Sequence, residues 1–159
     1  MRVLGIDPGS IITGYGVIDE IKGKLSPVAY GTIECKKKDP FPTRLKMIFD
    51  GLNKTIEDFK PEHIALENVF FGKSVKSAIK IGEARGVAAL CAAIAEKPMF
   101  EYDTTVVKRA VVGYGNAQKA QVREMVKIIL ALSETPKKFD ATDALAIAIC
   151  HCHRIKLKV

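Results

Sequence analysis

The sequence predicts an α/β fold in which a mixed five-stranded sheet is flanked by helices on both faces. Two observations indicate this fold. Short apolar runs bounded by turn residues predict strands, and longer segments with apolar residues at helical spacing predict helices. Their order is three strands, a helix, a strand, a helix, a strand and then helices, which is typical of such a layered sheet. The chain has 159 residues, 48% of them hydrophobic, so we expect one domain over residues 1–159.

The first three strands are predicted around turn signals. Residues 3–6 form an apolar run that stops at Asp7-Pro8-Gly9-Ser10. Proline sets φ for turn entry and glycine adopts positive φ, so we expect a tight turn here and a second strand over residues 13–18. A third strand is expected at residues 27–34, after the turn signal Lys22-Gly23-Lys24.

Helices and strands then alternate along the chain. We predict strands at residues 63–67 and 99–102, and helices at residues 43–59, 74–96, 104–111, 118–132 and 140–153. The inward face of the long helix at residues 74–96 is predicted to be Val75, Ala78, Ile79, Gly82, Gly86, Ala89, Leu90, Ala93 and Ile94.

Composition narrows the functional classes. No apolar run approaches the ~18 residues that a membrane span needs, and no signal-peptide pattern precedes the first strand. The cysteines at positions 35, 91, 150 and 152 show no disulfide pattern, so we expect a cytoplasmic protein. The formal net charge of +7 favours an anionic partner, of which nucleic acid is the commonest.

Four carboxylates occupy equivalent places where the chain leaves the predicted core. Asp7 ends the first strand, Glu67 ends the fourth, and Asp140 and Asp143 share one face at the start of the last helix. Each has a simpler interpretation: Asp7 as a turn residue, Glu67 as a solvated strand end, and the helix pair as capping residues. If the four converge, like charges ~4–5 Å apart repel by about 3–4 kcal/mol per pair at an effective dielectric near 20. An all-oxygen cluster suits Mg²⁺, and a pair of such ions suits phosphodiester cleavage.

Five sequence blocks stand out along the chain: DPGSIITGYGVI at 7–18, ALENVF at 65–70, GEARGVAA at 82–89, VKRAVVGYGNAQKAQV at 107–122 and DATDALAIAICHCH at 140–153. Together, in this order and spacing, they resemble the RuvC family of Holliday-junction resolvases. The resemblance implies a ribonuclease H-like fold, a homodimer, and paired symmetric nicks in a four-way DNA junction that leave ligatable 5′-phosphate and 3′-hydroxyl ends. It implies Mg²⁺, with Mn²⁺ as a substitute and two ions per site, and the branch-migration partners RuvA and RuvB. The family's catalytic and metal-binding carboxylates fall on Asp7, Glu67, Asp140 and Asp143. Asn68 departs from the Gln expected in some relatives, but it is not one of the four.

DNA-facing residues are predicted around this acidic cluster. By the resemblance Phe70 is the aromatic that stacks near the junction centre, whereas Phe71 is equally explained as core. The spacing of Lys73, Lys76 and Lys80 predicts a basic stripe on the long helix, either a phosphate contact or simply a solvated face. Lys108 and Lys119 match family lysines near the scissile phosphate, and Arg44 is a weaker candidate.

Other functions remain as alternatives. GIDPGS also resembles the phosphate loop of actin-like and sugar-kinase folds, although that architecture needs two such domains and more chain. A non-catalytic DNA-binding module would keep the fold but has no need of the carboxylates. Cys150-His151-Cys152-His153 does not form a zinc site in our interpretation, because neighbouring helical residues point in different directions. Gly82 and Gly86 fit either packing on the sheet or a helix-to-helix dimer contact.

Overall fold

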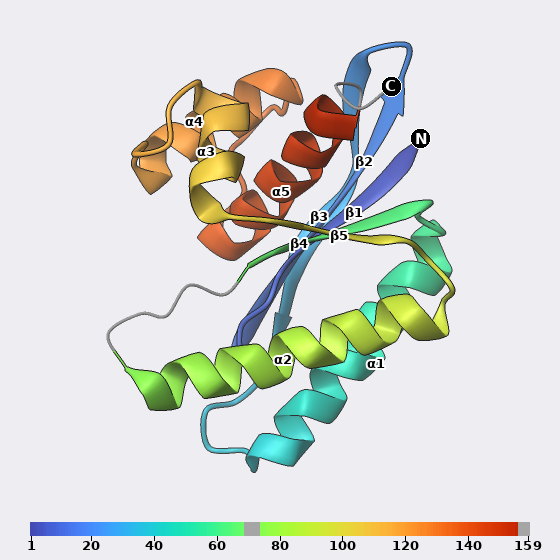
Figure 1. Cartoon of the computed structure of the whole chain (residues 1–159), viewed down its shortest axis with the longest axis vertical. Helices are drawn as coiled ribbons and strands as arrows, with labels where there is room; N and C mark the ends of the chain where they lie inside the picture. Colours follow the sequence, from blue (N-terminus) through green and yellow to red (C-terminus); the bar gives the residue numbers. More distant parts are fainter. Residues whose placement is uncertain (69–73, 156–159) are drawn as a thin grey trace.

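Within residues 1–68 and 74–155, the part that the computed structural model describes, five strands form a mixed sheet in the order β3-β2-β1-β4-β5 (Figure 1). β1 (Arg2–Asp7), β2 (Ile12–Ile21) and β3 (Lys24–Glu34) are antiparallel neighbours. β4 (His63–Glu67) runs parallel to β1, and β5 (Met99–Tyr102) runs parallel to β4. The mixed sheet is therefore confirmed, with β2 and β3 longer than predicted.

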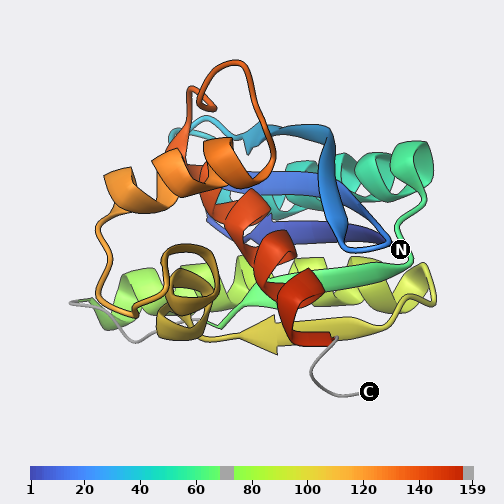
Figure 2. The ribbon, with the colours of Figure 1, turned by 90° about the horizontal axis from the view of Figure 1, so that it is seen from above.

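Helices cover both faces of the sheet (Figures 1 and 2). On one face lie α1 (Phe41–Phe59) and α2 (Val75–Ile94), and on the other lie α3 (Thr104–Val112), α4 (Lys119–Ile129) and α5 (Phe139–Ile155). The strands supply both cores because alternate side chains point to opposite faces. Leu4 and Ile6 of β1 pack with α1 and α2, whereas Val3 packs with α5.

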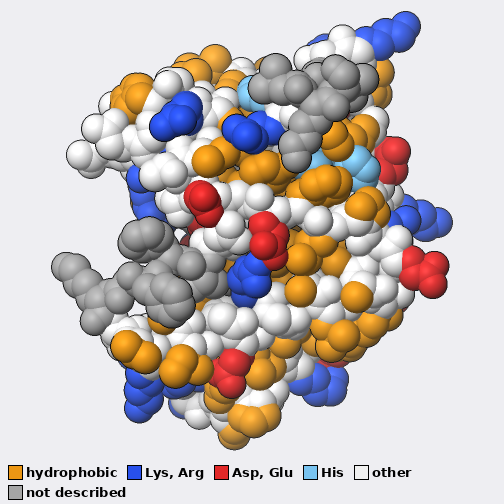
Figure 3. Space-filling model, viewed as in Figure 1, with side chains coloured by type: hydrophobic (Ala, Val, Ile, Leu, Met, Phe, Trp, Pro, Cys, Tyr) orange, Lys and Arg blue, Asp and Glu red, His pale blue; other side chains and the backbone are white. Residues whose placement is uncertain are grey.

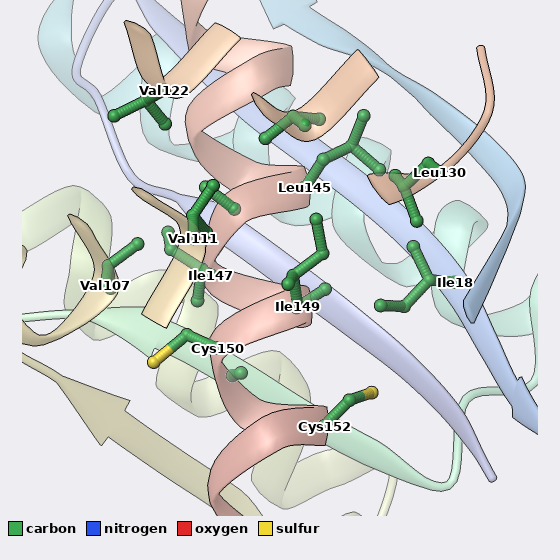
Figure 4. Close-up of a cluster of buried hydrophobic side chains, with 14 of the residues drawn as sticks. Ile18, Val107, Val111, Val122, Leu130, Leu145, Ile147, Ile149, Cys150 and Cys152 are labelled. Atoms are coloured by element: carbon green, nitrogen blue, oxygen red, sulfur yellow. The ribbon is translucent and has the colours of Figure 1, made fainter. Parts of the chain in front are cut away.

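The helix α5 is the centre of the second core. Figure 4 shows Val107 and Val111 of α3 and Val122 of α4 around it, with Leu145 and other α5 side chains between them and the sheet. Buried apolar residues occur almost all round α5 after its first turn, as its sequence predicts. A helix buried on this many sides holds its first turn in a fixed position.

Glycines in the strands let α5 lie directly on the sheet. A methyl group added at Gly5 would come within 2.8 Å of the backbone nitrogen of Ala148, and one at Gly16 within 2.8 Å of that of Leu145. At Gly14 an added methyl would overlap the backbone carbonyl of Asp140. Backbone atoms cannot yield as a flexible side chain can, so these positions require glycine for close approach.

The predicted inward face of α2 is wrong. The buried residues of this helix are small: Ala84, Ala88, Cys91 and Ala92. The larger apolar residues predicted to face inward are instead exposed, with relative exposures of 74% for Val75, 58% for Ile79, 52% for Leu90 and 59% for Ile94. Methyl groups added at Gly82 or Gly86 would meet nothing within 4 Å.

The reason for this error is that α2 has two apolar faces. Small residues bring α2 close to α1, which lies beside it on the sheet, so the face that packs is the less hydrophobic one. The other face remains uncovered, and Figure 3 shows apolar side chains over α2 on the lower half of the molecule. Among the described residues, no helix is both long and apolar enough to cross a membrane.

Candidate active site

Asp7 and Glu67 lie at the C-terminal ends of two neighbouring parallel strands, β1 and β4. In the parallel pairing of β1 with β4, Ile6 lies opposite Leu66. The residues that follow them, Asp7 and Glu67, therefore leave the sheet side by side. Asp7 is the last residue of β1 and Glu67 the last of β4. Both side chains are only partly exposed. The strand ends thus fix two of the four predicted carboxylates side by side.

The first turn of α5 adds the other two carboxylates. Asp7 pairs with Gly14 across the β1–β2 ladder, and Gly14 is the residue whose missing side chain leaves room for the backbone of Asp140. Asp140 and Asp143 are three residues apart and share one side of the helix. The close contact at Gly14 therefore places Asp140 and Asp143 next to Asp7.

The other three carboxylates lie close enough to Asp7 to act on its charge. The pKa of Asp7 is raised from 3.8 to about 8, first by burial and then by the charges of Asp143, Glu67 and Asp140, while Lys119 lowers it. The simpler interpretation of Asp7 as a turn residue does not require three other carboxylates around it. The fold thus holds a buried acidic group in a repulsive environment, a feature of functional sites.

Glu67 is held in the same environment. Burial raises its pKa above the ordinary value; a hydrogen bond with the Thr104 hydroxyl opposes this shift, and the charge of Asp143 adds to it. Lys119 and Lys108 both lower the pKa of Glu67. The two cations therefore lie close enough to act on the acidic cluster.

Lys119 bridges the acidic cluster and the surface. Its Nζ lies 2.9 Å from Oδ2 of Asp143, and its side chain is 65% exposed whereas that of Asp143 is 21% exposed. Burial lowers the pKa of Lys119, but the hydrogen bond to Asp143 and the charges of Asp143, Asp7 and Asp140 outweigh it, so the net shift is upward. Lys119 is thus a permanent cation beside the carboxylates.

A small cavity lies between these groups. It has a volume of about 130 Å³, and its lining includes Glu67, Thr104, Lys108, Lys119 and Asp143. Carboxylate and lysine side chains therefore line the same cavity. An anionic group such as a phosphate could be held there only if the carboxylate charge were neutralised, because the acidic side chains would otherwise repel it.

The donor set fits a hard divalent cation. Its ligands would be carboxylate oxygens, which Mg²⁺ and Mn²⁺ prefer, and the repulsion at Asp7 would be relieved by such an ion. As the side chains stand, no three His, Cys, Asp or Glu side chains of residues 1–68 and 74–155 surround one point closely enough to hold a metal. Asp143 is engaged by Lys119, so binding of an ion would require side-chain adjustment.

The remaining sequence predictions are distributed around this site. Phe70 and Lys73 lie outside the described residues. Lys76 is exposed on the first turns of α2. The cysteines of Cys150-His151-Cys152-His153 are buried in α5 and form no zinc site within the described part of the chain. His151 instead bonds the side chains of His63 and Tyr102 at 2.9 and 2.8 Å.

The hydrogen bond of Thr104 and the burial of Arg44 were not predicted from the sequence. Thr104 follows Asp103 at the start of α3, and no sequence signal links it to Glu67. Arg44 lies on α1, is only 6% exposed and donates from Nη1 to the carbonyl of Ser10 at 2.9 Å. A buried arginine at a position that faces the core of an amphipathic helix was the available signal, because Arg44 lies four residues before Ile48.

Comparison with known proteins agrees with this geometry. Residues 3–151 match the family model described as crossover junction endodeoxyribonuclease RuvC. The chain is 50% identical to the RuvC of Syntrophotalea carbinolica over 153 residues (96% of this chain and 94% of that protein) and 47% identical to that of Brevibacillus brevis over 151 residues (95% and 91%).

Solved structures extend the match to the fold. The structure of T. thermophilus RuvC in complex with Holliday junction substrate is 33% identical, with a TM-score of 0.94 and coverage of 99% of this chain and 96% of that one. Another Thermus thermophilus RuvC structure is 34% identical, with a TM-score of 0.90 and coverage of 99% and 97%. The predicted ribonuclease H-like fold is confirmed by these likenesses. With a family match over nearly its whole length, the chain belongs to the RuvC family of crossover junction endodeoxyribonucleases.

Proposed function

We propose that this protein is an endonuclease that resolves four-way DNA junctions by paired symmetric nicks in two like strands. The observation that carries the proposal is the convergence of Asp7, Glu67, Asp140 and Asp143 beside Lys119. The family match over residues 3–151 and the relative solved with a Holliday junction support the choice of substrate. We further propose that residues 1–159 form one nuclease domain.

The four carboxylates would hold the metal, and we propose Mg²⁺, with Mn²⁺ as a substitute and two ions per site. Bound divalent ions supply a Lewis acid that activates water and stabilises charge on a phosphodiester. The protein's own contribution is to fix the oxygen ligands: Asp7 and Glu67 on strand ends, and Asp140 and Asp143 on a buried helix. Thr104 fixes the carboxylate of Glu67 through a hydrogen bond.

Lys119 and Lys108 would act on the DNA phosphate. Both lie in the cavity that Glu67 and Asp143 also line, so a phosphate bound there meets cations as well as the metal ligands. Cations fixed before the reaction stabilise the negative charge that grows on the phosphate as water attacks. We expect 5′-phosphate and 3′-hydroxyl products, which a ligase can rejoin. Phe70, Lys73 and Lys76 remain proposed DNA contacts.

A matched set of amide variants tests the carboxylate roles. We expect Glu67→Gln and Asp143→Asn to bind a labelled four-way junction nearly as well as wild type in EDTA, yet to lose junction cleavage in Mg²⁺ by 10³-fold or more, on the order seen when a transition-state group is removed. Asp58→Asn on the exposed side of α1 is the control and should cleave normally. Cleavage that survives in Glu67→Gln would contradict the assignment.

We also propose a homodimer that uses the uncovered face of α2. Ile79, Leu90 and Ile94 are each more than half exposed on this helix, and exposed apolar stripes mark association sites. A two-fold dimer would present one active site to each of two like strands of a junction. Sedimentation should show a dimer for wild type and a monomer for Leu90→Asp, whereas Lys97→Asp should remain dimeric. A dimeric Leu90→Asp would exclude this face.

The family resemblance supports two broader proposals. We propose that the protein acts in the cytoplasm in homologous recombination and DNA repair, consistent with the buried free thiols of Cys35, Cys91, Cys150 and Cys152. We propose RuvA and RuvB as partners that move the junction before it is cut. Stimulation of junction cleavage by added RuvA and RuvB, measured at limiting enzyme, tests the partnership, and an unchanged rate would contradict it.

A further inference from the structure

A second cavity lies beside the acidic cluster, on the side of α1 and α2. Its volume is about 700 Å³, and it is lined by the turn at residues 9–12 together with side chains of both helices. The polar groups that line it include Ser10, Lys37, Arg44, Ser77, Lys80 and Asp140. Three cations thus face a cavity that contains one carboxylate, and that carboxylate belongs to the proposed active site.

Arg44 is the central group of this cavity. It is 6% exposed, and its Nη1 donates to the carbonyl oxygen of Ser10 at 2.9 Å. Its guanidinium carbon lies 5.0 Å from the centre of the Phe41 ring, a cation–π contact. Arg44 is thus a largely buried cation whose position is set by the turn at residues 9–12 and by Phe41.

Lys80 of α2 contacts the same aromatic ring, that of Phe41. Its Nζ lies 5.6 Å from the centre of the Phe41 ring, so Phe41 is contacted by two cations, one from each helix. Lys80 is partly buried and Lys37 is exposed at the rim. An excess of cations together with serine hydroxyls is the chemistry that recognises a phosphate.

The position of Asp140 relates this cavity to the cleavage site. Asp140 lines the cavity and also acts on Asp7, so the cavity and the acidic cluster share a wall. If the cut strand runs from the acidic cluster toward α1 and α2, a phosphate next to the scissile one reaches Arg44, Lys80 and Lys37. The cations also offset the repulsion that Asp140 exerts on that neighbour.

We propose that the pocket formed by Ser10, Lys37, Arg44, Ser77 and Lys80 binds a backbone phosphate of the junction strand that is cut, next to the scissile phosphate. This inference rests on the proposed nuclease function and assigns a substrate contact outside the acidic cluster. Arg44 acts as a positioning residue: it contacts the flanking phosphate and, through Ser10, supports the loop that follows Asp7. It does not touch the reacting atoms.

Salt-dependent binding tests this pocket without relying on cleavage. A fluorescein-labelled four-way junction is titrated in EDTA at several salt concentrations with wild type, Lys80→Gln, Lys37→Gln and the control Lys54→Gln, an exposed lysine on α1. We expect Lys80→Gln to weaken junction binding by roughly 3- to 10-fold and to make the slope of log affinity against log salt shallower by about 1. Lys54→Gln should match wild type. Unchanged slopes for both Lys80→Gln and Lys37→Gln would overturn the proposal.

Two substitutions of Arg44 test its role in positioning the strand. Arg44→Lys keeps the charge but loses the planar fork, and Arg44→Gln loses both; urea unfolding of each establishes that it is folded. At saturating junction in Mg²⁺, we expect both to cut more slowly than wild type and at less regular positions, because the strand is no longer held in register. A folded Arg44→Gln with wild-type cutting positions and wild-type salt slope would also overturn the proposal.

Competition with inorganic phosphate tests whether the pocket binds the DNA backbone or a free anion. At constant ionic strength, phosphate should compete with junction for wild type and less effectively for Lys80→Gln. Competition by phosphate without any change of salt slope on DNA would assign the pocket to a free anion and reject the strand contact. If no junction is cut by wild type but the slopes change as expected, the nuclease proposal fails, and the pocket remains a contact for a backbone phosphate of the junction without a scissile phosphate beside it.

Discussion

Replacing Asp7 by Asn should stabilise the metal-free protein while destroying its activity. The pKa of Asp7 is raised from 3.8 to about 8, first by burial and then by the charges of Asp143, Glu67 and Asp140. At pH 7 the folded protein without metal must therefore hold a proton on Asp7 that the unfolded chain does not. This cost is absent below about pH 4 and grows as the pH rises toward 8, so folding stability falls with rising pH across that range.

The size of the effect follows from the same shift. One pH unit of pKa difference corresponds to about 1.4 kcal/mol, so the cost at pH 7 reaches an upper limit of about 4 kcal/mol. An asparagine amide carries no charge but still loses hydration on burial, which removes part of the gain. We therefore expect Asp7→Asn to raise the free energy of unfolding by about 2–4 kcal/mol at pH 7 and by less at pH 5.

Urea unfolding in EDTA measures this gain at both pH values. Asp58→Asn, which removes a carboxylate that is 48% exposed and paired with Lys54, is the control and should change the free energy of unfolding by less than about 0.5 kcal/mol. Saturating Mg²⁺ should stabilise wild type much more than Asp7→Asn, because it binds the folded state through this carboxylate. An Asp7→Asn protein no more stable than wild type at pH 7 would contradict the conclusion that burial and the neighbouring carboxylates destabilise the charged form of Asp7.

Three further predictions concern the residues around the site. Lys119→Met should bind junction within a few-fold of wild type but cleave it about 10²–10³-fold more slowly in single-turnover assays, because the cation beside Asp143 is lost; equal rates would contradict this role. The pKa of His151 is lowered from 6.5 to about 4, by burial and then by His63. Stability from His151 is therefore complete above about pH 6.5 and is lost as the pH falls toward 4, by up to about 3 kcal/mol. The difference in urea stability between wild type and His151→Phe should shrink over that range, and a constant difference would count against it. Gly14→Ala should lower stability by about 1–3 kcal/mol and reduce cleavage, because its methyl group overlaps the backbone of α5; a variant with wild-type urea stability and activity would show that the contact is not close.

The sheet and its order of elements could be predicted because local signals and burial agree. β4 and β5 have the bounds that their apolar runs and flanking turns indicate. The buried face of α1, centred on Ile48, Leu52 and Ile56, follows its helical period. The face of α2 could not be predicted in this way, because periodicity alone does not distinguish a face that packs on α1 from one that is left uncovered.

The acidic residues of the candidate site could be predicted from the sequence, but the residues that contact and position them could not. Asp7 and Glu67 stand where apolar strands end, and Asp140 and Asp143 stand where an apolar helix begins, which is visible in the sequence. Thr104 and the buried environment of Arg44 depend on contacts between distant segments, and no local pattern encodes them. Lys119 was indicated only by the family resemblance, since its residue type and surroundings resemble those of any exposed lysine.

Cleavage of a synthetic four-way junction by wild type and Asp7→Asn in Mg²⁺, beside a linear duplex of the same sequence, tests the central claim most directly. We predict symmetric nicks in two like strands of the junction, products that a ligase reseals, no cutting of the duplex, and no cutting at all by Asp7→Asn although it still binds the junction. Equal cutting of duplex and junction would contradict junction resolution. Tight binding by wild type without cutting in Mg²⁺ or Mn²⁺ would contradict the nuclease itself.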